Sequence, residues 1–106
     1  MVQSLDEYRQ LVEATRGGKP LILNFTSQWD AQCKVTDPLF DRLAAEHAAT
    51  LVMKKCDVDR QHKIASAASI GAVPTFKVYK NGQEVDAQLG LDRDGLEGFV
   101  SQHAPI

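Results

Sequence analysis

The stretch "WDAQCK", residues 29–34, places a thiol, Cys33, three positions after a carboxylate, Asp30. A cysteine exchanges disulfides or attacks a substrate as the thiolate, so its reactivity depends on a lowered pKa and on access. The N-terminus of a helix lowers the pKa of a thiol, because the macrodipole and the free backbone N–H groups favour a negative charge. A carboxylate at the same helix end opposes this effect. The residues therefore present a candidate nucleophile, Cys33, beside an acid that is expected to raise its pKa.

A strand and a helix must position this pair. The apolar run "LILNFT", residues 21–26, predicts a strand that is buried on both faces. From Asp30 to about Ala49 the apolar residues return at helical spacing, and aspartate is a preferred N-cap residue. The segment 50–58 predicts a second strand. Two strands joined by a helix form a βαβ unit with a right-handed crossover, so Asp30 lies where the first strand turns into the helix.

The remaining segments predict the outer elements. Ser4, with Glu7 three residues later, begins a helix that "RGGKP" ends. A short helix opened by Asp59 is expected over residues 59–70. Residues 75–89 alternate apolar and polar types around "NG", which is the strongest short signal for a β-hairpin. The segment "RDGLEGFVSQH" predicts a closing helix with three inward residues, Leu96, Phe99 and Val100.

Together these elements predict an α/β fold. Its central mixed sheet has four or five strands, parallel first and antiparallel at the hairpin, and helices flank both faces. A length of 106 residues suits one domain, residues 1–106. With 43% apolar and 25% charged residues, the composition is typical of a soluble globular protein.

Charge and cysteine content exclude several classes of function. The formal net charge is −2 and no basic cluster is present, so neither a nucleic acid nor an anionic membrane is expected as a partner. No signal-peptide pattern and no apolar run of membrane-spanning length occur. The two cysteines are too few for a disulfide scaffold. We therefore expect a cytoplasmic or otherwise reducing compartment.

The other titratable residues predict no second site. Cys56 follows Lys55 on a predicted strand, so the two side chains point to opposite faces of the sheet. A disulfide between Cys33 and Cys56 is not expected, and Cys56 is interpreted as a core residue. The acidic pairs in "DVDR" and "DRDG" lack the length of a calcium loop. No metal site and no cofactor are predicted, because the histidines lie at scattered positions, His47, His62 and His103.

The order of elements and several short motifs closely resemble the thioredoxin family. The motifs are "WDAQCK", Pro38 five residues after the cysteine, "AVPTF" at 72–76, "KNG" at 80–82, and Gly90 after the last strand. The resemblance covers essentially the whole chain, except that the family's first strand is short or missing near Val2. It implies the thioredoxin fold and a role in cell redox homeostasis.

One position departs from this resemblance in a way that changes the chemistry. The family pattern is Trp-Cys-x-x-Cys-Lys; Trp29, Cys33 and Lys34 match it, whereas Asp30 replaces the first cysteine. In the family that cysteine is the exposed nucleophile, and the second, more buried cysteine resolves the mixed disulfide. An aspartate cannot form a disulfide, so the two-cysteine cycle is impossible within this chain.

A second departure lies beneath the turn. Where the family typically has a buried aspartate that is thought to move protons, this chain has Asn24, which is nearly isosteric but cannot ionise. Lys55 stands at the place of the lysine that often neighbours that acid. Loss of both the nucleophile and the proton carrier is expected where dithiol chemistry is no longer selected or has been removed.

The resemblance also implies a peptide-binding groove. It implies a cis peptide bond before Pro74, in a loop whose backbone edge accepts an extended peptide as an added strand. The groove would be formed by Trp29, Val73, Pro74 and Gly90. Docking of a protein or peptide partner beside Pro74 could thus persist without turnover.

Three hypotheses follow. The first is a thioredoxin-like binding or adaptor module without dithiol activity, because "WDAQC" is similar to the turn in the thioredoxin-like domain of multidomain monothiol glutaredoxins, which is regarded as non-catalytic. The second is a monothiol oxidoreductase in which Cys33 reacts with glutathione or another external thiol. The third is an active-site variant of a conventional thioredoxin, which Asn24 argues against.

Overall fold

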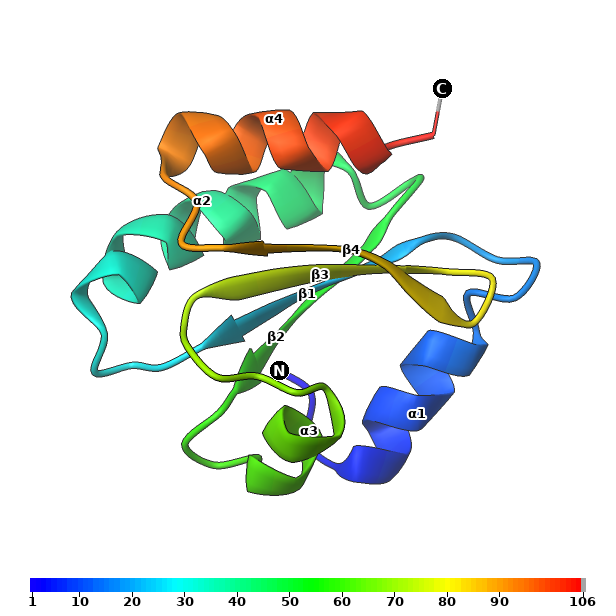
Figure 1. Cartoon of the computed structure of the whole chain (residues 1–106). Helices are drawn as coiled ribbons and strands as arrows, with labels where there is room; N and C mark the ends of the chain where they lie inside the picture. Colours follow the sequence, from blue (N-terminus) through cyan, green and yellow to red (C-terminus); the bar gives the residue numbers. More distant parts are fainter. Residues whose placement is uncertain (106) are drawn as a thin grey trace.

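The computed structural model describes residues 1–105 and contains every predicted helix and strand. Along the chain they are α1 Leu5–Glu13, β1 Leu21–Thr26, α2 Ala31–Glu46, β2 Val52–Asp57, α3 His62–Ala67, β3 Thr75–Lys80, β4 Gln83–Leu89 and α4 Arg93–His103 (Figure 1).

The four strands form one mixed sheet in the order β2-β1-β3-β4. β1 pairs with β2 in parallel, while β3 is antiparallel to both β1 and β4. The prediction of a thioredoxin fold with a mixed sheet is confirmed, with four strands. No strand forms near Val2 in residues 1–105; instead its backbone N–H donates one hydrogen bond of 2.9 Å to the Lys55 carbonyl of β2.

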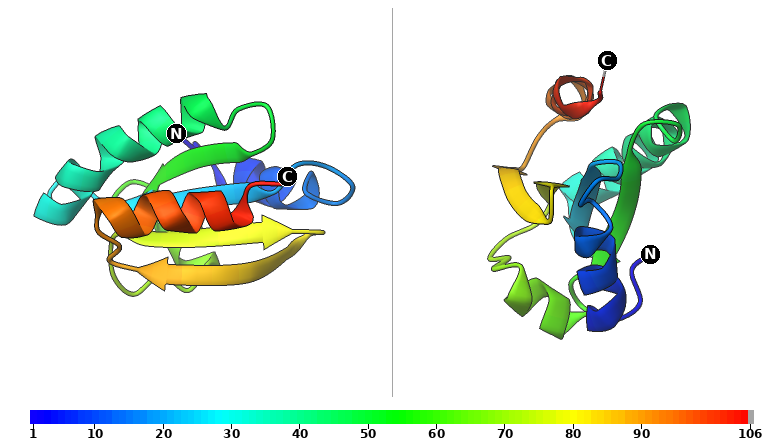
Figure 2. Two further views of the ribbon diagram at one scale, coloured as in Figure 1. Left: turned by 90° about the horizontal axis from the view of Figure 1, so that it is seen from above. Right: turned by 90° about the vertical axis from the view of Figure 1, so that its right-hand side faces the viewer.

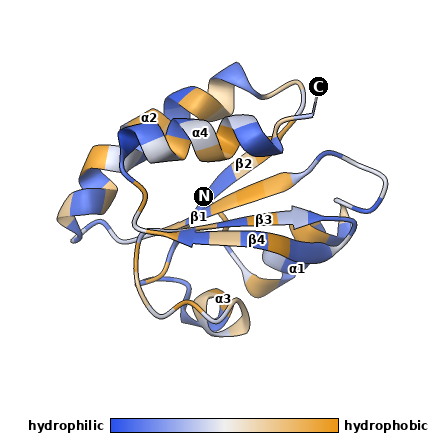
Figure 3. Ribbon diagram, turned by 45° about the horizontal axis from the view of Figure 1, so that its top comes forward, coloured by the Kyte–Doolittle hydropathy of each residue, from blue (hydrophilic) through white to orange (hydrophobic). Residues whose placement is uncertain are grey.

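Helices cover both faces of the sheet and enclose two apolar clusters. α2 and α4 lie on one face, and α1 and α3 on the other (Figures 1 and 2). Ile22, Phe40 and Phe76 belong to the cluster under α2 and α4, whereas Phe25 and Ile64 belong to the other. All of β1 is buried, as its continuous apolar run predicts. Figure 3 shows the mixed colouring of α2 and α4 that is typical of helices with one apolar face.

The first and third helices begin differently. The Ser4 hydroxyl accepts a hydrogen bond of 3.1 Å from the Glu7 backbone N–H, so the predicted cap of α1 is confirmed. The predicted cap of α3 is wrong. α3 begins after Gln61, which makes no side-chain cap bond, and Asp59 instead accepts a bond of 2.6 Å from the Ser27 hydroxyl. The Asp59 carboxylate, which its sequence position predicts as the cap of α3, therefore holds the loop after β1 instead.

The hairpin between β3 and β4 forms at "NG" as predicted. Asn81 and Gly82 have φ angles of 53° and 78°, the left-handed values that a tight type I′ turn requires at both central positions. The Gly82 N–H also donates a hydrogen bond of 2.8 Å to the Thr15 hydroxyl, which ties the turn to the end of α1. The turn sets the register of β4 on β3 next to the hairpin, and a bulge between Val78 and Tyr79 shifts it by one residue further along.

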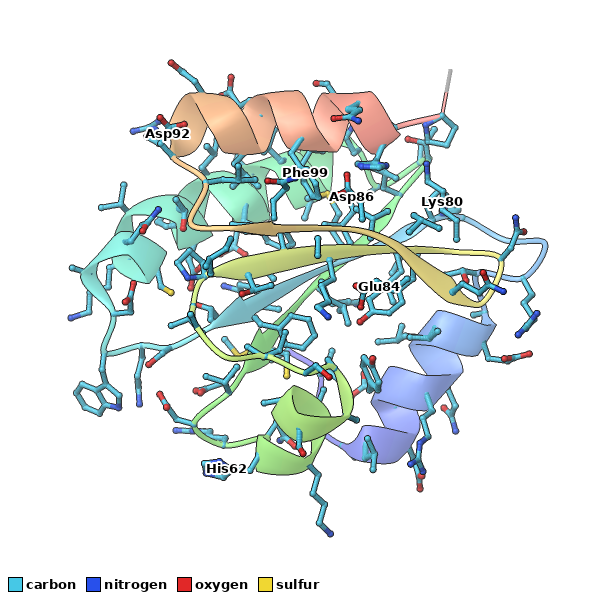
Figure 4. All side chains as sticks on the ribbon, viewed as in Figure 1. His62, Lys80, Glu84, Asp86, Asp92 and Phe99 are labelled. Carbon is cyan, nitrogen blue, oxygen red and sulfur yellow. The ribbon has the colours of Figure 1, made fainter. Side chains whose placement is uncertain are left out.

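A polar contact joins β4 to the end of α4. Figure 4 shows Asp86 on the α4 side of β4 and Glu84 on the opposite side. Asp86 Oδ2 lies 2.8 Å from His103 Nε2. This hydrogen bond lowers the pKa of Asp86 below its ordinary value. The ionised carboxylate therefore favours the folded state, and α4 is held on the sheet by this bond as well as by apolar packing.

We expect the free energy of unfolding of Asp86→Asn to fall less steeply at acid pH than that of the wild type. A carboxyl whose pKa is lower in the folded than in the unfolded chain stabilises the fold above its unfolded pKa of about 3.9, and this stability disappears as the pH falls through the folded value. Urea unfolding between about pH 6 and pH 3 measures the effect. Asp94→Asn, which removes an exposed acid from α4, is the matched control. Identical pH slopes for wild type and Asp86→Asn would contradict the assignment.

Candidate functional site

Asp30 is the N-cap of α2. Its backbone is extended, and its Oδ1 accepts a hydrogen bond of 2.9 Å from the Cys33 backbone N–H. This bond is the main reason that the pKa of Asp30 lies below its ordinary value, so the carboxylate is ionised at neutral pH. The side chain is partly exposed. A negative charge therefore stands at the first turn of α2, facing solvent.

We expect Asp30→Ala to lower the free energy of unfolding, because the Cys33 N–H would lose its partner at the helix start. Asp30→Asn should retain most of the stability, since asparagine caps helices equally well. Chemical denaturation of both variants measures the difference. Equal stability of wild type and Asp30→Ala would show that the cap bond contributes nothing.

Cys33 lies in the first turn of α2 but is fully buried. Burial raises the pKa of its thiol above the ordinary value, and the hydrogen bond and charge of Asp30 raise it further. The Thr26 hydroxyl and the Ser27 backbone act in the opposite direction with a smaller net effect. The shift has the direction predicted from the sequence. A fully buried thiol with a raised pKa is a poor nucleophile at neutral pH.

Alkylation should detect this environment directly. We expect Cys33 in the folded chain to react slowly with iodoacetamide, with a pH midpoint above the value of about 8.5 for a free cysteine. The reaction of Cys56 with iodoacetamide must be subtracted from the total alkylation. Cys56 is also buried, and burial raises its pKa to about 11, so a Cys33→Ser variant supplies the background rate. A midpoint well below 8.5 would instead indicate an activated thiolate.

Asn24 is fully buried between β1 and α2, and its partner is a residue that the sequence analysis missed. Asn24 Nδ2 donates a hydrogen bond of 2.9 Å to Asp37 Oδ1. The Thr26 hydroxyl donates one of 2.8 Å to Asp37 Oδ2. Both oxygens of Asp37 are therefore held by side chains of β1. The available signal was helical spacing, because Asp37 follows Cys33 by four residues and so shares its face of α2.

The other two residues predicted to support the site, Lys55 and Pro38, make no hydrogen bond to Asn24. Lys55 lies opposite Asn24 in the β1–β2 register, but its Nζ donates a hydrogen bond of 3.0 Å to Asp41 Oδ2. Pro38 lies inside α2 and is exposed. Asn24 Oδ1 has no hydrogen-bond partner among residues 1–105. Asp37 is thus the only acid that contacts Asn24 through a hydrogen bond in this part of the chain.

The four predicted groove residues lie on loops at the same end of the sheet. The peptide bond between Val73 and Pro74 is cis. The Gly90 N–H donates a hydrogen bond of 2.9 Å to the Pro74 carbonyl, which joins the loop before β3 to the loop after β4 (Figure 1). Trp29, on the loop before α2, is 77% exposed. The side chain of Gln32 completes the arrangement, since its Nε2 donates to the Gly90 carbonyl at 2.8 Å.

A cavity of about 270 Å³ opens beside Thr26. Its walls include Thr26, Gln28, Asp37, Asp57 and Arg60. Arg60 Nε lies 3.9 Å from Asp57 Oδ2, so the opposed charges are paired only loosely. The described residues contain no group of three histidine, cysteine or acidic side chains that could hold a metal ion.

The two thiols are on opposite sides of the sheet. Cys56 packs with Phe25 and Ile64 under α1 and α3, whereas Cys33 belongs to α2. Both are free and buried. Within residues 1–105, no helix is long and apolar enough to cross a membrane.

Comparison with known proteins agrees with the fold. The thioredoxin family model matches residues 1–102. A thioredoxin H-type of Chlamydomonas reinhardtii is 39% identical over 95 residues, which cover 90% of this chain and 84% of that protein. A thioredoxin of Malassezia sympodialis is 36% identical over 97% of this chain and 99% of its own. The structure of Plasmodium falciparum thioredoxin superimposes with a TM-score of 0.88 at 29% identity, covering 97% of each chain. The chain belongs to the thioredoxin family.

Proposed function

We propose that this chain is a thioredoxin-fold binding module of redox homeostasis that lacks dithiol reductase activity. The observation that carries the proposal is Asp30, a helix cap at the position where the family pattern has its nucleophilic cysteine. Thiol–disulfide exchange within one chain needs two sulfurs that can reach each other. The sheet separates Cys33 from Cys56, so no second sulfur is in reach.

The binding half of the proposal rests on the groove. Trp29, Val73, Pro74 and Gly90 share one end of the sheet, and the indole of Trp29 is largely exposed without a partner in residues 1–105. An exposed aromatic residue beside an unpaired backbone edge is typical of peptide recognition. The similarity of "WDAQC" to the thioredoxin-like domain of multidomain monothiol glutaredoxins supports the same function.

The monothiol alternative is less favoured. Reaction of Cys33 with glutathione or another thiol requires access and a thiolate, whereas this side chain is fully buried and its pKa is raised. A single substitution in a conventional thioredoxin is also less favoured, because Asn24 and Asp37 form a matched pair beneath the turn. One change at position 30 does not account for that pair.

Insulin reduction in the presence of NADPH and thioredoxin reductase tests the proposal. We expect no turnover above that of the reductase alone. A conventional thioredoxin serves as the positive control, and circular dichroism of the assayed sample confirms that the chain is folded. A rate within about tenfold of the positive control, a difference of about 1.4 kcal/mol in barrier height, would overturn the proposal.

A further inference from the structure

We propose that the groove selects an extended peptide segment that presents a lysine or arginine side chain to Asp30 and Trp29. The inference rests on the proposed function, because it names the chemistry of the partner that the groove binds. It is carried by three observations at the end of the sheet where α2 begins. They are the charge of the surrounding loops, the free side of the Asp30 carboxylate and the exposure of the neighbouring indole.

The loops that surround the groove carry only negative charge. They comprise residues 27–30, 68–74 and 90–92, and they contain two aspartates and no lysine, arginine or histidine. Asp92 is used as the cap of α4, where its Oδ1 accepts a hydrogen bond of 2.7 Å from the Gly95 N–H. Asp30 is the other acid. The exposed cations Lys34 and Arg93 follow these loops in the first turns of α2 and α4, so the charge that favours a cationic side chain on the loops themselves is that of Asp30.

Asp30 has capacity left for a ligand. Its Oδ1 is occupied by the Cys33 N–H, and within residues 1–105 it forms no ion pair. Lys34, one turn further along α2, donates its backbone N–H to the Asp30 carbonyl, but its ammonium group reaches no carboxylate in the described part of the chain. A carboxylate held rigidly through one oxygen can accept a hydrogen bond from an incoming ammonium or guanidinium group through the other.

Trp29 supplies a second contact for the same cation. It precedes Asp30 in the sequence and is 77% exposed, so its ring face is open. Tryptophan is the best aromatic partner for a lysine or arginine cation. A groove that recognised only apolar side chains would gain nothing from an ionised acid beside its aromatic residue. An exposed indole and a carboxylate on consecutive residues therefore favour a basic side chain over an apolar one.

The backbone beside Pro74 accounts for the extended shape of the ligand. The Pro74 carbonyl is occupied by Gly90, and the Ala72 carbonyl accepts a hydrogen bond of 2.7 Å from the Thr75 hydroxyl. Between them, Val73 makes no hydrogen bond through its N–H or C=O to another described residue. A segment in strand conformation can pair with Val73 and direct one side chain toward Asp30.

Selection from a random peptide library tests the inference on the intact chain. Phage-displayed ten-residue peptides are selected for binding, and the enriched sequences are synthesised for fluorescence titration and for mapping by backbone amide shifts. We expect enrichment of lysine or arginine at one fixed position, and shifts at Val73, Gly90 and Cys33. Replacing that residue by norleucine should weaken binding about tenfold, through loss of both the ionic and the cation–π contacts.

Control variants distinguish the preference for a basic residue from peptide binding as such. Asp30→Asn preserves the cap and should weaken binding about fivefold, while Asp6→Asn removes an exposed acid from α1 and should change it less than about twofold. High salt should reduce the wild-type affinity to that of Asp30→Asn. If the peptides bind the groove without a preference for a basic residue, or if Asp30→Asn leaves that preference unchanged, this inference alone is wrong. Failure of any peptide to shift the groove amides would overturn the proposed binding function as well.

Discussion

Asp30→Cys should convert this chain into one that closes a disulfide between positions 30 and 33 and reduces insulin. The wild-type Asp30 side chain already lies against the first turn of α2, where it accepts a hydrogen bond from the Cys33 N–H. A thiol in its place would sit at the helix N-terminus, partly exposed, with no carboxylate to oppose its ionisation. Both sulfurs that the exchange reaction needs would then be present on one chain.

The test follows the thiol count and the rate together. Oxidation by glutathione disulfide should remove two thiols from the Asp30→Cys chain as an internal disulfide. Insulin reduction should rise at least about tenfold above the wild-type background. Asp30→Ser keeps a cap residue without a sulfur and should remain inactive. A closed disulfide without any gain in activity would show that the missing acid at Asn24, rather than the missing sulfur, limits the scaffold.

Asn24→Asp is expected to destabilise the fold by about 3 kcal/mol at pH 7. The new carboxyl would be fully buried and would stand where Asn24 Nδ2 now lies 2.9 Å from Asp37 Oδ1. Two carboxylates at this distance repel each other, so the pKa of the added carboxyl should rise well above its ordinary value. A rise of two to three pKa units corresponds to roughly 3 kcal/mol, at 1.36 kcal/mol per unit.

The stability lost in Asn24→Asp should depend on pH in a defined direction. The pKa of the added carboxyl would be higher in the folded than in the unfolded chain, so the folded state would bind more protons. The destabilisation should therefore be small below about pH 4 and grow as the pH rises through the neutral range. Urea unfolding at several pH values measures it. A constant loss of stability at all pH values would instead indicate a steric effect.

Two variants isolate the cause. Adding Asp37→Asn to Asn24→Asp restores one amide and one acid, and should recover most of the lost stability. Asn81→Asp makes the same chemical change at an exposed turn and should have little effect. If the double variant is no more stable than Asn24→Asp, repulsion from Asp37 is not the cause. The family's usual acid at position 24 is thus expected to be incompatible with the helix that now covers it.

Local patterns in the sequence were sufficient for the elements and for the chemistry at the turn. The period of the apolar residues depends on contacts within one strand or helix, so β1 and α2 could be placed before the structure was known. The cap of α2 joins Asp30 to a backbone group three residues later, which is also a local interaction. Because position 30 holds a carboxylate in place of a sulfur, the sequence alone excludes a disulfide between positions 30 and 33.

Only the tertiary structure decided how polar side chains pair. The Asn24–Asp37 contact spans 13 residues, Ser27–Asp59 spans 32 and Gln32–Gly90 spans 58. Each partner depends on how α2 and the loops pack against the sheet. Hence Asp37 was missed and Asp59 was wrongly assigned as a cap, whereas Asp30 was placed correctly. Local hydrogen bonds follow from the backbone within one turn, while long-range ones follow from packing.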